Sequence, residues 1–177
     1  MFDPVPEAQL SDDEGGVAPA GPGWFVVNVA DARASRSARF GASARFEGDQ
    51  RFPEFAINVR VLEPGQPNGL YHREEAQEAA LVLSGECLAL VEGEERRLRK
   101  GDFLHLPPGT AHIVVGAGEG PCSLLMVGTR KDPERLFYPA EEVAARHGAA
   151  AAEDTPDEEV AYAGSPDPVP GRLGLPW

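Results

Sequence analysis

Short apolar segments separated by turn-forming residues fill the middle of this chain, and they restrict the fold more than any other feature. The segments are WFVVNV (24–29), FAINVRVL (55–62), AALVL (79–83), CLALV (87–91), RRLR (96–99), DFLHL (102–106), HIVVG (112–116) and CSLLMV (122–127). Several alternate, as where Val59 and Val61 stand against Asn58 and Arg60, which is typical of a strand with two different faces. No helical pattern interrupts residues 55–127. The spacing therefore predicts an all-β sandwich or barrel.

Charge divides the 177-residue chain into three parts. Residues 1–22 hold five acids and no base, the middle is nearly balanced, and residues 139–177 are again acidic, within a formal net charge of −13. We expect a flexible acidic arm over 1–22, one barrel domain over 23–138, and a short helix followed by an extended acidic tail over 139–177. The helix signal is PAEEVAARHG, and the apolar residues Leu175 and Trp177 could anchor the tail.

Several classes of function are disfavoured by composition. The balanced middle argues against a surface that binds nucleic acid. No apolar run is long enough to span a membrane, and the first residues lack the basic and apolar regions of a secretory signal. The only two cysteines, Cys87 and Cys122, are too few for a disulfide framework and are not spaced as metal ligands. We therefore expect a cytoplasmic protein with two buried thiols.

Two stretches carry the residues suited to chemistry. In GDFLHLPPGTAH, residues 101–112, proline and glycine form a tight turn after one strand, and His112 opens the next. In LYHREEAQE, residues 70–78, His72 lies beside three carboxylates, including Glu74 and Glu78. If this second stretch is extended, positions 72, 74 and 78 share parity and face one side of the chain.

These stretches resemble the two sequence motifs of the cupin superfamily. The second motif, G-x5-P-x-G-x2-H, is matched from Gly101 to His112 without a mismatch. The first motif reads G-x5-H-x-H-x3,4-E-x6-G, and Gly65, Glu78 and Gly85 occupy its first glycine, its glutamate and its last glycine. The resemblance implies a cupin fold, which is a double-stranded β-helix or jelly-roll barrel. Most of residues 24–150 also resemble small bacterial single-domain cupins of uncharacterised function.

The histidine pair of the first motif is where this chain departs from the family. With three residues before the glutamate, His72 takes the first histidine position and Glu74 the second, and the gap after the first glycine is one residue longer. With four residues, Tyr71 and Arg73 take these positions, and the motif has no nitrogen ligand. We prefer the first alignment because it keeps His72.

The resemblance implies that His72, Glu74, Glu78 and His112 stand where cupins place their metal ligands, with Gln77 as an alternative oxygen ligand to Glu74. Two imidazoles and two carboxylates suit one divalent transition metal, namely Fe, Mn, Zn or Ni. In metal-free cupins the same positions hold ordinary polar pocket residues, and this alternative stays open.

Two further groups of residues are candidates of lower rank. His105 could line the pocket as a proton shuttle, although a surface histidine is the more common case. Arg33, Arg36 and Arg39 recur at helical spacing and could form a stripe on one helix face, which is usually solvated charge.

By analogy with cupins, we expect a metal-dependent enzyme that acts on a small organic molecule in an oxygenase-type or isomerase-type reaction. The alternative is a non-catalytic protein that binds or senses a small ligand in the same pocket. We also expect a homodimer, because cupin barrels commonly pair.

Overall fold

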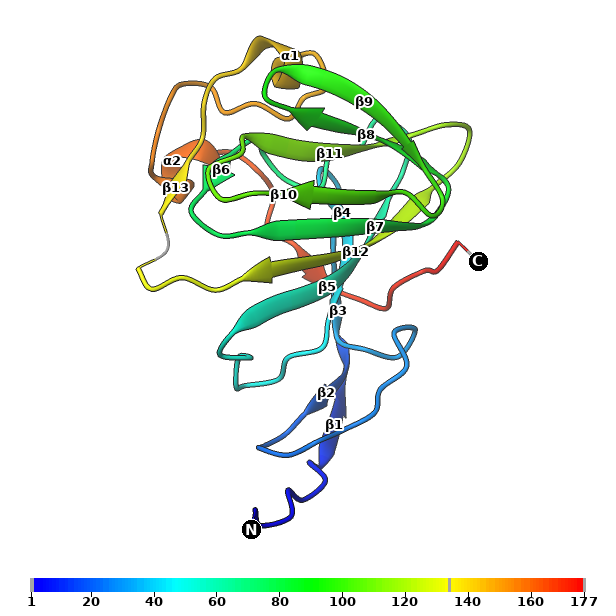
Figure 1. Cartoon of the computed structure of the whole chain (residues 1–177). Helices are drawn as coiled ribbons and strands as arrows, with labels where there is room; N and C mark the ends of the chain where they lie inside the picture. Colours follow the sequence, from blue (N-terminus) through cyan, green and yellow to red (C-terminus); the bar gives the residue numbers. More distant parts are fainter. Residues whose placement is uncertain (1, 134, 177) are drawn as a thin grey trace.

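The computed structural model describes residues 2–133 and 135–176, which form a barrel of two antiparallel sheets (Figure 1). The larger sheet has the strand order β10-β7-β12-β5-β4-β3-β14, and the smaller sheet has the order β11-β8-β9. In the larger sheet the strands are β10 (Phe103–Leu106), β7 (Glu78–Ser84), β12 (Cys122–Thr129), β5 (Phe55–Leu62), β4 (Gly41–Arg45), β3 (Ala34–Ser37) and β14 (Val169–Pro170). In the smaller sheet they are β11 (His112–Ala117), β8 (Glu86–Val91) and β9 (Glu94–Arg99). The predicted all-β class is confirmed.

The remaining elements are short. They are the strand pair β6 (Arg73–Glu74) and β13 (Leu136–Phe137), the hairpin β1 (Leu10–Asp13) and β2 (Gly16–Pro19), and the helices α1 (Glu142–Ala145) and α2 (Glu158–Ala161). Helix α1 lies within the predicted helical stretch but is shorter, whereas α2 was not predicted. Among the described residues, no helix is long and apolar enough to cross a membrane.

The main hydrophobic core lies between the two sheets. Leu62 and Leu124 of the larger sheet are fully buried there against Cys87 and Val114 of the smaller sheet. Burial of an aliphatic side chain of this size contributes about 1.5–3 kcal/mol to stability. Cys122 belongs to the same core, and both cysteines are free buried thiols, as predicted.

Strand β5 places different side chains on the two faces of the larger sheet. Val59 and Val61 belong to a second apolar cluster, which is covered by the N-terminal segment and by Leu173 of the tail. Asn58 and Arg60 lie on the opposite face and line a cavity inside the barrel. The polar face of this alternating strand therefore points inward, because the apolar face is covered by segments from both ends of the chain.

The strand predicted for residues 24–29 is wrong. Within the described residues, the pairing of this segment is limited to one bridge between Trp24 and Glu7. Val27 and Val29 instead pack against the second apolar cluster. The alternating apolar residues of this segment pack on the face of the larger sheet, and the segment is not one of its strands.

The helical stripe proposed for Arg33, Arg36 and Arg39 is also wrong, because residues 34–45 form the hairpin of β3 and β4. The three guanidinium groups have separate partners. Arg33 pairs with an aspartate of β1, Arg36 donates to the carbonyl of Arg172, and Arg39 donates to the hydroxyl of Ser165. Helical spacing alone did not distinguish a helix from a strand that carries polar residues.

The two ends of the chain pack against each other and against the barrel. Within the predicted flexible arm 1–22, the structure places the β1–β2 hairpin, which projects below the barrel in Figure 1. Arg172 of the tail donates to the side chain of Asp12 in β1. In the tail, Leu173 is buried and Leu175 packs against the same cluster, whereas Trp177 lies outside the described residues.

Candidate metal centre

His72 and His112 are brought together by one isolated antiparallel bridge. The backbone N–H of His72 donates to the carbonyl oxygen of His112 at 3.2 Å, and the reverse bond measures 2.8 Å. Residues directly opposite in such a pair project their side chains to the same face. The two imidazole rings accordingly lie with their centroids 4.8 Å apart. The second motif thus positions its histidine against the histidine of the first motif.

Backbone carbonyl groups fix the proton on each imidazole. Nδ1 of His72 lies 2.8 Å from the carbonyl oxygen of Leu70, and Nδ1 of His112 lies 3.0 Å from that of Thr110. A carbonyl oxygen only accepts, so Nδ1 carries the proton in both neutral rings and Nε2 keeps its lone pair. This arrangement is the one found around histidines that bind metal ions.

Glu78, the first residue of β7, supplies a carboxylate to the same place. The ligand atoms of His72, Glu78 and His112 all lie within 4.8 Å of one another. Gly128 of β12 stands opposite Glu78 in the sheet, and the Glu78 side chain lies against this glycine, with Cγ 3.4 Å from where a Cβ would be. The register of the larger sheet therefore directs Glu78 towards the two histidines.

The contact between Glu78 and His112 fits two ligands that converge on one ion. Oε2 of Glu78 is 2.8 Å from Nε2 of His112, yet this buried oxygen has no hydrogen-bond partner with suitable geometry. The atoms are close without pointing along a hydrogen bond. A buried carboxylate oxygen without such a partner is costly, and a cation bound between the two atoms would satisfy both.

The electrostatics of the three groups are coupled. Burial and the neighbouring His112 lower the pKa of His72. Burial alone would lower the pKa of His112, but the Glu78 carboxylate outweighs this effect and raises it. Burial would raise the pKa of Glu78, but the interaction with His112 outweighs it and lowers the value. In the metal-free protein, these pKa shifts favour a cationic His112 beside an anionic Glu78.

The other predicted site residues are placed differently. Glu74 lines the same cavity as Glu78. Gln77 is exposed and is absent from the cavity lining. Tyr71 is buried in an apolar cluster, and Arg73 is exposed. The alternative alignment, which gives these two residues the histidine positions, therefore names residues that lie outside the His/Glu/His cluster.

His105 lies on β10 and is exposed. It is not among the residues that line the cavity. The position of His105 therefore does not support the suggestion that it acts as a proton shuttle in the pocket.

The cavity around the cluster has a volume of about 310 Å³. Apolar walls come from Ile113 and Met126, and polar residues that the sequence did not single out also reach it, including Asn58, Arg60 and Tyr162. The sequence signal for Asn58 and Arg60 was their place on the polar side of an alternating strand. Nothing in the sequence marked that side as the interior.

Together, fold and site define a small β-barrel protein with a His/Glu/His cluster inside the barrel. The sequence model of the cupin domain matches residues 58–128, a stretch that contains the whole cluster. A sugar phosphate isomerase of the cupin superfamily from Silicibacter pomeroyi has 23% identity and a TM-score of 0.57 over 65% of this chain and 82% of its own. The polyketide cyclase RemF from Streptomyces resistomycificus has 18% identity and a TM-score of 0.55 over 68% and 89%. Residues 58–128 of the chain thus match the cupin domain, and the chain shares the fold of these two proteins.

These similarities define the fold but no reaction. A protein from Acidithiobacillus ferrooxidans has 28% identity and a TM-score of 0.45, with 47% of this chain covered. The match spans about half, 55%, of the length of that protein. No curated protein matches the chain.

Proposed function

We propose that this protein binds one divalent transition metal ion through His72, Glu78 and His112, with Glu74 as a fourth, oxygen ligand. The observation that carries the proposal is the convergence of three donor atoms within 4.8 Å. Its support comes from the Nδ1 protons of both histidines, which are held by carbonyl groups, and from the unsatisfied buried oxygen of Glu78.

The donor set indicates the kind of metal. Imidazole nitrogen and carboxylate oxygen suit Fe(II), Mn(II), Zn(II) or Ni(II), and the absence of thiolate donors disfavours a structural zinc site of the zinc-finger type. When bound, such an ion supplies a Lewis acid or a redox centre for a small organic molecule. We therefore propose an enzyme of the oxygenase or isomerase type.

The residues of the chain have separate tasks in this proposal. His72 and His112 hold the ion in fixed orientation, because each ring is tied to a backbone carbonyl. Glu78 supplies a negative charge in a partly buried place. Ile113 and Met126 contribute apolar surface that limits water around the ligand. A cavity of about 310 Å³ is at the lower end of the range that accommodates small organic ligands.

Elemental analysis tests the metal site. The protein is purified without added metal and without nickel affinity resin, alongside His112→Ala and the control His105→Ala. We expect about one equivalent of Fe, Mn, Zn or Ni in the wild type and in His105→Ala, and none in His112→Ala. Wild-type protein that takes up no metal even after reconstitution would refute the proposal.

A second measurement separates the enzyme from the non-catalytic binder. Ligands that protect the protein against thermal unfolding are identified first, with and without metal. An enzyme requires the metal for turnover of at least one of them. Retained ligand affinity in metal-free protein, with no turnover in loaded protein, would favour the binder or sensor instead.

A further inference from the structure

Within the described part of the chain, a second cavity of about 350 Å³ adjoins the cavity around His72, Glu78 and His112, which we call the metal cavity. The two cavities share five lining residues, which are Arg60, Asn68, Gly69, Tyr162 and Glu158. The second cavity is rich in hydrogen-bond donors, because Ser35, Ser37, Ser43, Arg45 and Ser165 also line it. Arg60 therefore stands at the junction between a metal cavity and a donor-rich cavity.

Arg60 is a largely enclosed cation whose charge has no carboxylate partner in the described part of the chain. Its single hydrogen bond in the described structure runs from Nε to the side-chain oxygen of Asn58, at 3.2 Å. No ion pair involves Arg60 among residues 2–133 and 135–176. Arg130, which also lines the metal cavity, is instead held by both carboxylate oxygens of Glu47. The terminal nitrogens of Arg60 thus remain as donors towards the cavities.

Ser43 adds an unsatisfied hydroxyl beside Arg60. The two residues are directly opposite in the pairing of β4 and β5, so their side chains share one face of the sheet. Ser43 is only 5% exposed, and among the described residues its Oγ has no hydrogen-bond partner. A buried hydroxyl without a partner is destabilising, and a ligand oxygen in the second cavity would remove this cost.

Tyr162 provides a third donor at the junction. Its hydroxyl oxygen accepts the backbone N–H of Leu70 at 3.0 Å, and no acceptor for its own proton occurs in the described structure. The ring is fixed by edge-to-face contacts with Phe40 and Tyr138. The hydroxyl is therefore held in place with a proton available for a ligand.

The charges around Arg60 leave room for an anion. Burial and the like charge of Arg45 lower the pKa of Arg60 to about 10, so it stays cationic at neutral pH. Glu158 and Asp167 also line the second cavity, but both are exposed and neither forms an ion pair with Arg60. Water screens exposed carboxylates strongly, whereas a ligand oxyanion inside the cavity would be screened much less.

We infer that Arg60, Ser43 and Tyr162 form a subsite for an oxyanion, the carboxylate or phosphate group of a small organic molecule. A planar guanidinium group binds two oxygens of such a group at once, and the hydroxyls of Ser43 and Tyr162 donate to the others. The other end of the molecule lies in the metal cavity, and this part of the inference rests on the proposed function. The substrate class is therefore a small organic acid or a phosphorylated small molecule.

Anion binding is tested in metal-free protein. Two-dimensional ¹H–¹⁵N spectra are recorded during separate titrations with inorganic phosphate and with acetate, at constant ionic strength set by chloride. We expect shifts at the amides of Ser43 and Arg60, and the tighter of the two anions identifies the group that the subsite prefers. Arg60→Met weakens binding by about tenfold or more, since charge-assisted bonds are lost. Ser43→Ala weakens it by a smaller factor, about threefold to tenfold.

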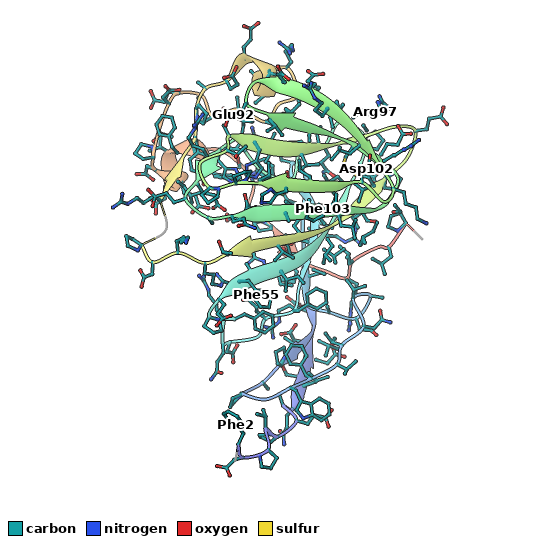
Figure 2. The ribbon with its side chains drawn as sticks, viewed as in Figure 1. Phe2, Phe55, Glu92, Arg97, Asp102 and Phe103 are labelled. Atoms are coloured by element: carbon teal, nitrogen blue, oxygen red, sulfur yellow. The ribbon has the colours of Figure 1, made fainter. Side chains whose placement is uncertain are left out.

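The control variant is Arg97→Met. Arg97 lies on β9, and Figure 2 shows it at the surface of the barrel. Its side chain is 63% exposed and pairs with Glu86. The Arg97→Met variant removes the same charge from the chain as Arg60→Met, and we expect it to leave anion binding unchanged. Arg60→Met is expected to fold, because it removes an unpaired enclosed charge and keeps the aliphatic stem. If it does not fold, the affinity of Ser43→Ala decides the question.

The inference is overturned if neither anion shifts these amides, or if folded Arg60→Met binds both anions as the wild type does. Its failure is separable from that of the proposed metal site. Arg60→Met keeps its metal in elemental analysis, since Arg60 is not a ligand. Anion binding to a protein that never takes up metal would refute the metal site alone.

Discussion

Alanine at two motif glycines, Gly85 and Gly109, should destabilise the protein to different degrees. Both have left-handed backbone conformations, with φ of 70° at Gly85 and 84° at Gly109. Their surroundings differ. A Cβ at Gly109 would meet nothing within 4 Å, whereas a Cβ at Gly85 would lie 2.6 Å from the carbonyl oxygen of Pro121 and 2.8 Å from Cα of Cys122.

The expected magnitudes follow from these distances. The left-handed conformation costs alanine about 1–2 kcal/mol, and this cost applies to both positions. At Gly85 the obstructing atoms are backbone, so the turn after β7 must move away from the start of β12. Overpacking of this kind costs about 1–3 kcal/mol more. We therefore expect losses of about 1–2 kcal/mol for Gly109→Ala and about 2–5 kcal/mol for Gly85→Ala.

Urea unfolding of both variants and the wild type, followed by circular dichroism in excess chelator, measures the difference without a contribution from metal. The slope with denaturant should be unchanged, so that the midpoints report stability directly. Equal losses at the two positions would refute the reasoning, because backbone conformation alone would then explain both glycines. A smaller loss at Gly85 than at Gly109 would refute it as well.

Three further predictions concern the site, the thiols and the surface. Glu74→Gln keeps the size of the side chain but removes its charge, so metal affinity should fall by about 10–100-fold in chelator competition, while the metal-free protein keeps its stability. Cys87 and Cys122 are fully buried, so a thiol reagent should label them only after unfolding, which mass spectrometry with and without urea will detect. Hydrogen bonding, above all with His147, lowers the pKa of Glu95 below 4.5. The contribution of Glu95 to stability is therefore present above pH 4.5 and is lost as the pH falls through the lowered pKa. The urea midpoints of wild type and Glu95→Gln should therefore differ more at pH 6 than at pH 3.

The convergence of His72, Glu78 and His112 could be predicted because short-range geometry determines much of it. Pro107 and Gly109 specify a tight turn, and the residue spacing then carries His112 into the next strand whatever the rest of the chain does. Preferring the alignment that keeps His72 also identified the histidine that the bridge places opposite His112. The prediction of Glu78 could not rest on local geometry alone, since the direction of its side chain depends on the register between β7 and β12. Here the spacing of the first motif identified Glu78.

The position of Arg60 at the cavity could not be predicted from the sequence of β5, because it depends on other segments of the chain. Alternation of apolar and polar residues in a strand identifies two faces but does not say which of them is interior. The usual expectation places the polar face in solvent. Here residues from both ends of the chain, among them Val27 and Leu173, cover the apolar face, and the polar face lines the cavities. Only the tertiary packing of these distant segments reverses the assignment.

The ligand set and Arg60 give the joined cavities two poles of opposite charge. Glu74 and Glu78 form a negative pole, and an oxyanion that binds at Arg60 with its other end near them would be repelled in metal-free protein. A divalent cation at the cluster carries enough charge to neutralise both carboxylates, and this repulsion is then removed. With Glu74 as the proposed fourth ligand, the charge of the site depends more strongly on metal. A molecule that reaches from Arg60 to the cluster is therefore expected to bind more tightly when the metal is present, whereas phosphate or acetate alone binds at Arg60 without it.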